Sequence, residues 1–264
     1  MRYLSSSSKA TWLACRLKSY YAKSSVVVPP EVNANLIRGT AGHAALEYFY
    51  KAEPHQRSLE ALLANARLSV EEQAAALDDP QEWHVDEFRA GLVGAERALT
   101  TFWKTVGRDE GTPAMDVEVN FETLLIPGWA YRGIIDGLAE TAGGLVIYEH
   151  KFPTSNPSDL LQYTHFAPQV REYAWGLDTP LQVWVRFTVC GPSRTAHATM
   201  PVPRSLIDEA GRNLRLVARE MEEGVIVPTE GIHCLRCPFK GLCLARTSGG
   251  EIDYYKEGSN DAGV

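Results

Sequence analysis

Hydrophobic and polar positions follow a helical period through the first part of the chain. The run SSSSKATWLACRLKSYY begins with serines, which cap helices well, and continues with apolar residues three or four positions apart. We therefore predict a first helix that carries Cys15. The same spacing predicts a second helix, which carries His43, in NANLIRGTAGHAALEYFYKA, and further helices over residues 58–77 and 81–106.

The pattern changes at residue 114, where short β-branched segments partly alternate with polar residues. MDVEVNFETLL, WAYRGIIDGLAE and LVIYEHKF predict three strands separated by turn residues. A helix near residues 160–177, strands in LQVWVRFTVC and AHATMPV, and a long helix near 203–223 are predicted to follow. Helices around a central run of strands predict a mixed α/β domain rather than a doubly wound one.

The segment RGIIDGLAETAGGLVIYEHKF predicts a hairpin that gathers polar side chains on one face. If its turn is centred between Ala142 and Gly143, Asp136 lies opposite Glu149, with Cβ atoms about 5 Å apart. Lys151 lies two residues beyond Glu149 and therefore points to the same face of the strand. The hairpin thus predicts an aspartate, a glutamate and a lysine close together.

This group of side chains has the chemistry of a metal-dependent hydrolytic site. Two neighbouring carboxylates repel each other and shift each other's pKa unless a cation lies between them. Such oxygen ligands suit Mg²⁺ or Mn²⁺, and a nearby lysine can polarise an attacking water or neutralise charge on a phosphate. The prediction is a phosphodiester-hydrolysing site, and the alternative is a solvated polar face of the sheet.

The charge of the chain is unevenly distributed. The formal net charge is −7, which argues mildly against a nucleic-acid partner. Residues 1–38 and 231–246 nevertheless carry +8 together, which leaves −15 on the remainder. A local basic surface of this kind can bind phosphates on an acidic protein, although a solvated basic face explains the charge equally well.

Taken together, GIIDGL, the glycine turn and YEHK resemble the PD-(D/E)XK nuclease superfamily, and more narrowly its RecB-like branch with the CRISPR-associated iron–sulfur exonucleases. The resemblance implies a restriction-endonuclease-like core, a mixed sheet flanked by helices. It implies that Asp136 and Glu149 hold the metal with His43 of the GTAGH segment, and that Lys151 activates water or stabilises charge. It extends from Cys15 to residue 243, with the motifs in the family's order.

Two further side chains take their roles from this resemblance. The segment QVREY supplies Gln169 and Tyr173, which lie four residues apart and so share one face of a helix. In the family such a pair lines the site and positions the scissile strand. Without the resemblance, an amphipathic helix with a half-buried tyrosine would be the preferred interpretation. Glu47 and Glu118 are weaker candidates for additional acids near the metal.

The cysteines add a second expected cofactor. GIHCLRCPFKGLC has Cys-x2-Cys-x5-Cys spacing, formed by Cys234, Cys237 and Cys243. Zinc and iron–sulfur sites usually take four ligands, and the resemblance implies Cys15 as the fourth, with Cys190 and His233 as weaker competitors. It also implies a [4Fe–4S] cluster, although four thiolates would suit zinc as well.

The predicted organisation is one nuclease domain followed by a tail. The domain covers residues 1–246, with an iron–sulfur lobe formed by 1–30 and 224–246, a helical region over 31–110 and the catalytic sheet over 114–202. The Gly-, Ser- and acid-rich segment 247–264 is expected to be a disordered tail.

These features predict a metal-dependent deoxyribonuclease, an exonuclease that acts on single-stranded DNA or DNA ends. The alternative is a DNA-binding or scaffold subunit of a CRISPR-adaptation or recombination complex, with its nuclease face idle. An odd number of cysteines and no recognisable signal peptide or membrane helix predict a cytoplasmic protein. Partners other than DNA would be a second copy of the chain or proteins of such a complex.

Overall fold

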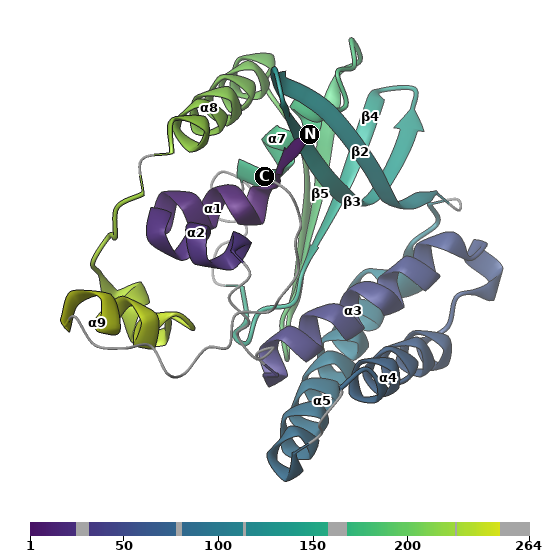
Figure 1. Cartoon of the computed structure of the whole chain (residues 1–264). Coiled ribbons are helices and arrows are strands. Elements are labelled where there is room, and N and C mark those ends of the chain that lie inside the picture. Colours follow the sequence, from purple (N-terminus) through teal and green to yellow (C-terminus); the bar gives the residue numbers. More distant parts are fainter. Residues whose placement is uncertain (25–31, 78–80, 113–114, 158–167, 225, 249–264) are drawn as a thin grey trace. The chain divides into compact units, whose positions relative to one another are not determined.

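The computed structural model describes residues 1–264 except 25–31, 78–80, 113–114, 158–167, 225 and 249–264 (Figure 1). The expected disordered tail and the first part of the helix expected near 160–177 lie largely outside the described residues. The chain divides into two compact units. The first comprises Met1–Glu31, Leu124–Tyr131 and Arg212–Val264, and the second comprises Val32–Thr123 and Arg132–Gly211.

The second unit contains most of a mixed sheet. Its strands are β2 (Asp116–Ile126), β3 (Trp129–Thr141), β4 (Gly144–Lys151), β5 (Val183–Cys190) and β6 (Thr195–Pro201), of which β2 and β3 continue into the first unit. β3 and β4 are antiparallel, β4 and β5 parallel, and β5 and β6 antiparallel, while β2 also pairs with β3. The predicted strands are confirmed, and the alternation of parallel and antiparallel pairs confirms the predicted mixed sheet.

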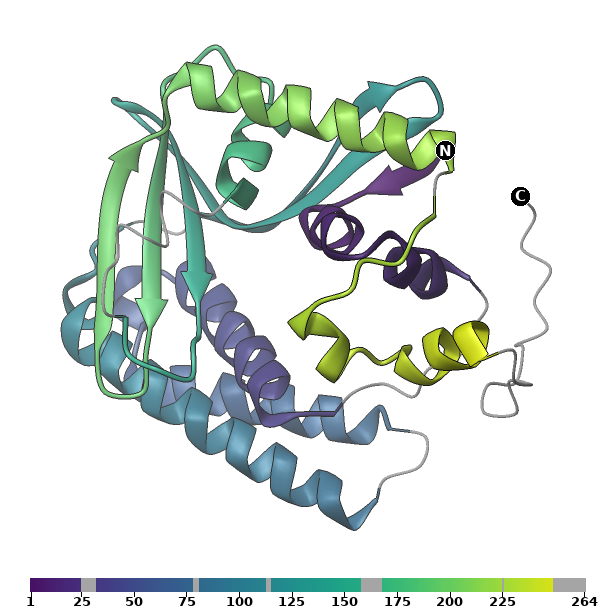
Figure 2. The same ribbon diagram turned by 90° about the vertical axis from the view of Figure 1, so that its left-hand side faces the viewer.

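Helices accompany this sheet as the periodicity predicts. They are α3 (Ala34–Lys51), α4 (Leu59–Ala75), α5 (Glu82–Thr105), α7 (Pro168–Gly176) and the first part of α8 (Arg204–Glu223), with short 3₁₀ turns at Pro54–Gln56 and Gly107–Asp109. Side-chain oxygens cap two of these helices, since Asn33 accepts from the Leu36 N–H and Ser58 from the Ala61 N–H. α3, α4 and α5 pack against one another (Figures 1 and 2).

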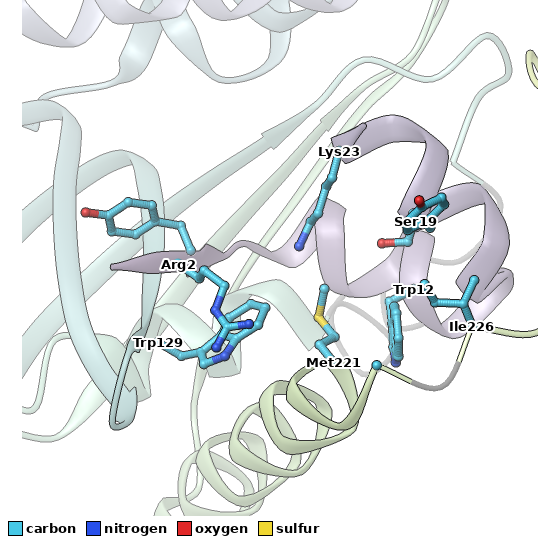
Figure 3. Close-up of a pocket in the computed structure, with 10 residues that line it drawn as sticks. Arg2, Trp12, Ser19, Lys23, Trp129, Met221 and Ile226 are labelled. Carbon is cyan, nitrogen blue, oxygen red and sulfur yellow. The ribbon is translucent and has the colours of Figure 1, made fainter. Parts of the chain in front are cut away.

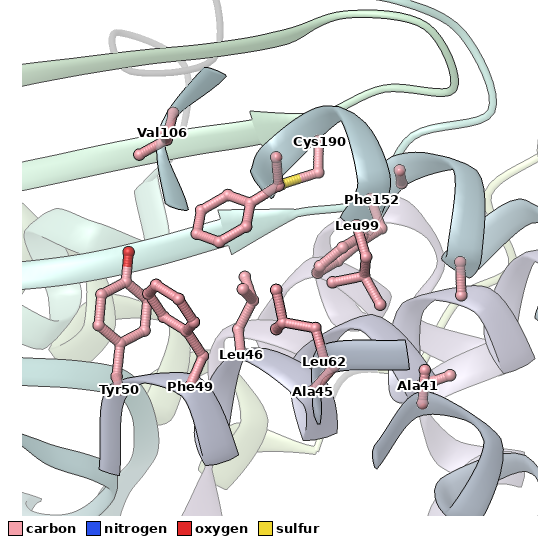
Figure 4. Close-up of a cluster of buried hydrophobic side chains, with 14 of the residues drawn as sticks. Ala41, Ala45, Leu46, Phe49, Tyr50, Leu62, Leu99, Val106, Phe152 and Cys190 are labelled. Carbon is pink, nitrogen blue, oxygen red and sulfur yellow. The ribbon is translucent and has the colours of Figure 1, made fainter. Parts of the chain in front are cut away.

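The hydrophobic core of the second unit lies between these three helices and one face of the sheet (Figure 4). Phe49 is at its centre, with its ring 5.3 Å from the ring of Phe102. Val146 and Tyr148 of β4 belong to the same core. Because side chains alternate along a strand, the odd-numbered residues of β4 point to the opposite face, where α7 packs. Helices therefore flank both faces of the sheet.

The first unit contains both described ends of the chain. Its elements are β1 (Arg2–Leu4), α1 (Ser6–Ala14), α2 (Arg16–Lys23), the later part of α8, a 3₁₀ turn at Ile232–Arg236 and α9 (Lys240–Ser248). β1, which the sequence pattern does not predict, runs parallel to the beginning of β3, with Tyr3 opposite Ala130. In the part of the chain that the structure describes, no helix combines the length and apolarity that a membrane crossing requires.

The prediction of one first helix that carries Cys15 is wrong in detail. Cys15 has extended backbone angles, φ −162° and ψ 114°, and separates α1 from α2. Its backbone N–H donates to Thr11 O at 2.9 Å and closes α1, while its thiol accepts from the Lys18 N–H at 3.4 Å and caps α2. Apolar spacing alone does not reveal this break, because the periodicity continues through it.

Candidate active site

The hairpin between β3 and β4 has the predicted register. Gly137 lies opposite Tyr148, and the ladder continues without a bulge to Thr141 opposite Gly144. Asp136 precedes Gly137 by one residue, and continuation of the register therefore places it opposite Glu149. The two-residue turn between the strands fixes this pairing, since a shift by one residue would turn one carboxylate to the other face.

Asp136 is held at its position from two sides. Its Oδ2 accepts a 2.7 Å hydrogen bond from the backbone N–H of His150, and its Oδ1 lies 3.5 Å from Nδ1 of His43. Burial alone would raise the pKa of Asp136, but the hydrogen bond and positive charge of His43 lower it below its ordinary value. Asp136 is therefore a fixed, negatively charged oxygen donor.

Glu149 has a different environment. Its side chain is 1% exposed, and one carboxylate oxygen accepts a hydrogen bond from Lys151 Nζ. The other oxygen, Oε2, has no hydrogen-bond partner among the described residues. Burial and repulsion by the charge of Asp136 raise the pKa of Glu149 to about 7, although Lys151 acts in the opposite direction. A cation near Oε2 would relieve both effects.

His43 approaches the hairpin from α3. Burial is the largest single influence on the pKa of His43 and lowers it, but the hydrogen bond to Asp136 and the negative charges of Asp136 and Glu149 together raise the pKa above its ordinary value. The ring of Phe152 lies 5.5 Å from the His43 ring, edge to face. Gly42 allows this approach, because a Cβ at that position would lie 2.5 Å from the Phe152 ring. Phe152 was not among the predicted site residues, since its contact with α3 cannot be inferred from its place after the lysine.

Gln169 and Tyr173 of α7 lie beside the same group of side chains; the four-residue spacing predicts only their shared helical face, and the resemblance implied their place at the site. Lys151 Nζ donates to Gln169 Oε1 at 3.3 Å, and Gln169 Nε2 donates to the Tyr173 hydroxyl. The Tyr173 ring lies edge to face with Phe121 of β2, with centroids 5.6 Å apart. A continuous polar chain therefore extends from Glu149 to Tyr173.

Glu118 on β2 is a further acid close to this group. Burial comes first among the causes that raise its pKa, followed by the negative charges of Asp136 and Glu47. Its φ of +49° is unusual for a residue other than glycine and costs about 1–3 kcal/mol. Glu47 itself forms an ion pair with Lys51, at 2.6 Å. The sequence identified both acids, but it contains no sign of the backbone strain at Glu118.

Sequence reasoning missed the part that His150 plays beneath the site. Its ring is stacked on Tyr50, with centroids 5.3 Å apart, and neither ring nitrogen has a hydrogen-bond partner among the described residues. Complete burial lowers the pKa of His150 to about 4, so the ring is neutral near pH 7. The packed ring holds the backbone N–H that donates to Asp136, a role that a side-chain pattern does not reveal.

The donor chemistry of the site fits a divalent cation. Two neighbouring carboxylates, one with a buried oxygen that lacks a hydrogen-bond partner in the described part of the chain, are the oxygen ligands that Mg²⁺ and Mn²⁺ prefer. The arrangement is not a closed metal cage, since the described residues contain no group of three or more His, Cys, Asp or Glu side chains that could hold a metal ion. The ligand set His43, Asp136 and Glu149 therefore stays a prediction.

The four predicted cluster cysteines all belong to the first unit, and none of them forms a disulfide bond in the described part of the chain. Cys15 and Cys234 share one neighbour, because Thr229 N–H donates to Cys15 Sγ at 3.5 Å and Cys234 Sγ lies 3.8 Å from Thr229 O. Cys234 lies in a 3₁₀ turn, and Cys243 in α9. The absence of a preformed metal-holding group among the described residues applies to these thiols as well.

Cys190 and His233 were the weaker candidates for the fourth ligand. Cys190 belongs to the second unit, is completely buried, and has a pKa raised by burial to about 12, which opposes formation of a thiolate. His233 Nε2 lies 2.8 Å from Thr229 O, in the neighbourhood of Cys15 and Cys234.

Comparison with known proteins defines the class of this chain. A sequence model of the PD-(D/E)XK nuclease superfamily matches residues 3–244, and the chain therefore belongs to that superfamily. A proposed exonuclease from Eubacterium rectale, known from its crystal structure, has a similar fold. It has a TM-score of 0.54 and 12% identity, and the match covers 100% of this chain and 94% of that one.

Two other solved structures are more distant. SSO0001 is 16% identical with a TM-score of 0.38, over 87% of this chain and 92% of that chain. LHK-Exo in complex with dAMP is 14% identical with a TM-score of 0.32, over 83% and 97%. No curated protein matches the sequence.

Proposed function

We propose that this protein is a metal-dependent DNA exonuclease that acts on single-stranded DNA or DNA ends. The observation that carries the proposal is the hairpin pair of Asp136 and Glu149 beside Lys151, where Glu149 Oε2 has no hydrogen-bond partner from any residue that the structure describes. Membership of the PD-(D/E)XK superfamily supports nuclease chemistry, and the choice of DNA and of strand ends is the proposed part.

Each side chain has a distinct role in this proposal. Asp136 and Glu149 hold Mg²⁺ or Mn²⁺, with His43 as a third ligand. A bound cation would supply charge stabilisation and a more acidic water at the scissile phosphate. Lys151, which already reaches Glu149 and Gln169, orients that water and stabilises the negative charge that develops on the phosphate.

Gln169 and Tyr173 orient the strand in the same proposal. Lys151 holds one end of the Gln169 amide, and Tyr173 holds the other, so the amide plane has little freedom to rotate. Phe121 supports the Tyr173 ring from β2. Side chains fixed in this way keep a bound phosphodiester close to its reactive geometry.

We also propose that Cys15, Cys234, Cys237 and Cys243 bind a [4Fe–4S] cluster, with zinc as the alternative occupant. The spacing of the last three supports it, as does the shared contact of Cys15 and Cys234 with Thr229. Because no closed site is preformed among the described residues, cluster binding would have to draw the thiols together. Iron and zinc analysis of the purified protein, with its visible absorbance, separates the two occupants.

The test of the nuclease proposal is digestion of end-labelled single-stranded DNA with Mn²⁺. Wild type is compared with Lys151→Ala and with Lys104→Ala, a matched control because Lys104 is exposed on α5 of the same unit. We expect wild type and Lys104→Ala to cut equally, and Lys151→Ala to lose about 10²-fold or more of the rate. Equal cutting by all three proteins would contradict the assignment of the site.

Digestion of a closed circular single strand distinguishes exonuclease from endonuclease activity. An exonuclease degrades the linear strand and leaves the circle intact, because the circle has no end. Cleavage of the linear strand and of the circular strand at similar rates would show an endonuclease. DNA binding by wild type without any cleavage would favour the alternative, a binding or scaffold subunit of a CRISPR-adaptation or recombination complex. Light scattering would show whether a second copy of the chain is a partner.

A further inference from the structure

The first unit contains a pocket that is separate from the carboxylate site of the second unit. Its volume is about 420 Å³, and its walls come from β1, α1, α2, the beginning of β3 and the end of α8 (Figure 3). Sites for small ligands usually have volumes of about 300–1,000 Å³. The pocket is therefore large enough for a small ligand or for one residue of a polymer.

Two cations face one aromatic ring in this pocket. The guanidinium of Arg2 lies 4.7 Å from the centre of the Trp129 ring, and Nζ of Lys23 lies 5.3 Å from it. Glu222 fixes two members of this group, because it pairs with Arg2 and accepts a 2.6 Å hydrogen bond from Trp129 Nε1. Arg2 and Trp129 thus line the pocket together, and Glu222 contacts both of them.

Lys23 is the charge that this arrangement leaves uncompensated. In the described part of the chain it has no acidic partner, and its ammonium group extends from α2 into the pocket (Figure 3). Burial lowers the pKa of Lys23, and the positive charge of Arg2 lowers it further. An anion bound beside Lys23 would compensate both effects.

Apart from Ser19, the remaining walls are aromatic or apolar. Trp12 is buried, Tyr20 is 49% exposed at the edge of the pocket, and Met221 and Ile226 close it from the other side. Inorganic phosphate would leave these surfaces uncovered, whereas an apolar ligand would leave Lys23 without a counterion. The pocket therefore fits a ligand that combines a negative charge with a flat ring.

We propose that this pocket binds one nucleotide of a DNA strand, with its phosphate beside Lys23 and Arg2 and its base against the aromatic and apolar wall. The proposal rests on the proposed DNA nuclease and gives the first unit a strand-binding site of its own. Stacking on aromatic side chains and contact with basic groups are the interactions by which single strands bind without sequence preference. A free nucleotide has the same chemistry, and the experiment separates the two sources.

The test is fluorescence polarisation with a labelled oligothymidine strand, in Lys151→Ala protein so that the strand remains intact. Lys23→Gln removes the charge but keeps a long stem against Trp129, and Lys18→Gln on the same helix is the matched control outside the pocket. We expect Lys23→Gln to weaken binding about tenfold and Lys18→Gln to change it less than about twofold. Equal effects of the two substitutions would overturn the proposal.

An abasic strand with the same phosphates tests the contribution of the base. We expect it to bind at least about fivefold more weakly than oligothymidine, because aromatic stacking is lost. Tyr20→Ala should weaken binding of oligothymidine, and Tyr20→Phe should preserve it. Equal binding of the abasic strand would overturn the stacking role. Competition by dTMP at the same concentration as the strand would overturn the assignment to a strand and indicate a free-nucleotide site.

The strand-binding measurement tests the pocket proposal independently of the cleavage test. If wild type does not cut DNA but Lys23→Gln loses strand binding, the pocket proposal stands and the nuclease proposal fails. If wild type cuts DNA while Lys23→Gln binds like Lys18→Gln, only the pocket proposal fails. Thermal unfolding of both variants within a few degrees of wild type shows that each remains folded.

Discussion

The two candidate sites of this protein differ in what holds their residues in place. Asp136 and Glu149 lie on paired strands, whose ladder sets their separation without a ligand. The cysteines of the first unit instead lie between two helices, in a 3₁₀ turn, at the end of that turn and in α9. A site on a ladder is formed by folding alone, whereas in the proposed cluster a bound metal would have to bring thiols on such separate elements together.

The largest effect on the cleavage rate is expected from substitution of a carboxylate on the β3–β4 ladder. Asp136→Asn should lower cleavage by about 10²-fold or more, because the metal loses a charged ligand. The fold should persist, since the asparagine oxygen can still accept from the His150 N–H. Asp116→Asn, an exposed change on β2, is the control. Loss of activity together with unfolding of Asp136→Asn would assign a structural role to this carboxylate.

Removal of a cysteine thiol should have different effects in the two units. Cys243→Ser is expected to abolish metal content and to lower the melting temperature of the first unit, because metal binding contributes directly to folding. Cys190→Ala should retain the metal and cost about 1 kcal/mol from the lost packing. Iron and zinc analysis with calorimetry measures both. Equal metal content in the two variants would exclude Cys243 as a ligand.

Two glycines of α3 test the packing that positions His43, and they should act in opposite directions. A Cβ at Gly42 would lie 2.5 Å from the Phe152 ring, whereas a Cβ at Gly39 would meet nothing within 4 Å. Gly42→Ala should therefore destabilise the protein by about 1–2 kcal/mol, and Gly39→Ala should stabilise it by about 0.5–1 kcal/mol. Urea unfolding measures both. Stabilisation by both substitutions would show that Phe152 moves aside freely.

The smallest effect is expected at the far end of the polar chain. Tyr173→Phe keeps the ring against Phe121 but removes the hydroxyl that accepts from Gln169. Cleavage should fall by about threefold to tenfold, because one orienting hydrogen bond of the Gln169 amide is lost. Single-turnover rates on end-labelled DNA measure the change. A loss as large as that of Asp136→Asn would give Tyr173 a direct part in the reaction.

The hairpin shows what the sequence predicts well. A two-residue turn with alternating strands leaves one register that buries the apolar face, and the observed pairs from Gly137 opposite Tyr148 to Thr141 opposite Gly144 follow it. The helices of the second unit were predictable for a similar reason, since their caps and periodicity are local. Local sequence patterns predict the hairpin register and these helices because both depend mainly on residues close together in the sequence.

Features that depend on distant residues were not predictable in the same way. Cys15 breaks a periodic run because its thiol caps the following helix, and β1 forms only because the beginning of β3 accepts it. The pocket group joins Arg2 and Lys23 to Trp129, more than 100 residues away in the sequence. No local pattern specifies such a contact.

The role of the hairpin can be tested by locating the metal itself. Crystals soaked in Mn²⁺ would be measured for anomalous scattering at the manganese edge. We predict a peak between the carboxylates of Asp136 and Glu149, within bonding distance of Glu149 Oε2, and its loss in Glu149→Gln. A peak elsewhere, or no peak at a Mn²⁺ concentration that supports cleavage in solution, would contradict the assignment of this hairpin as the active site.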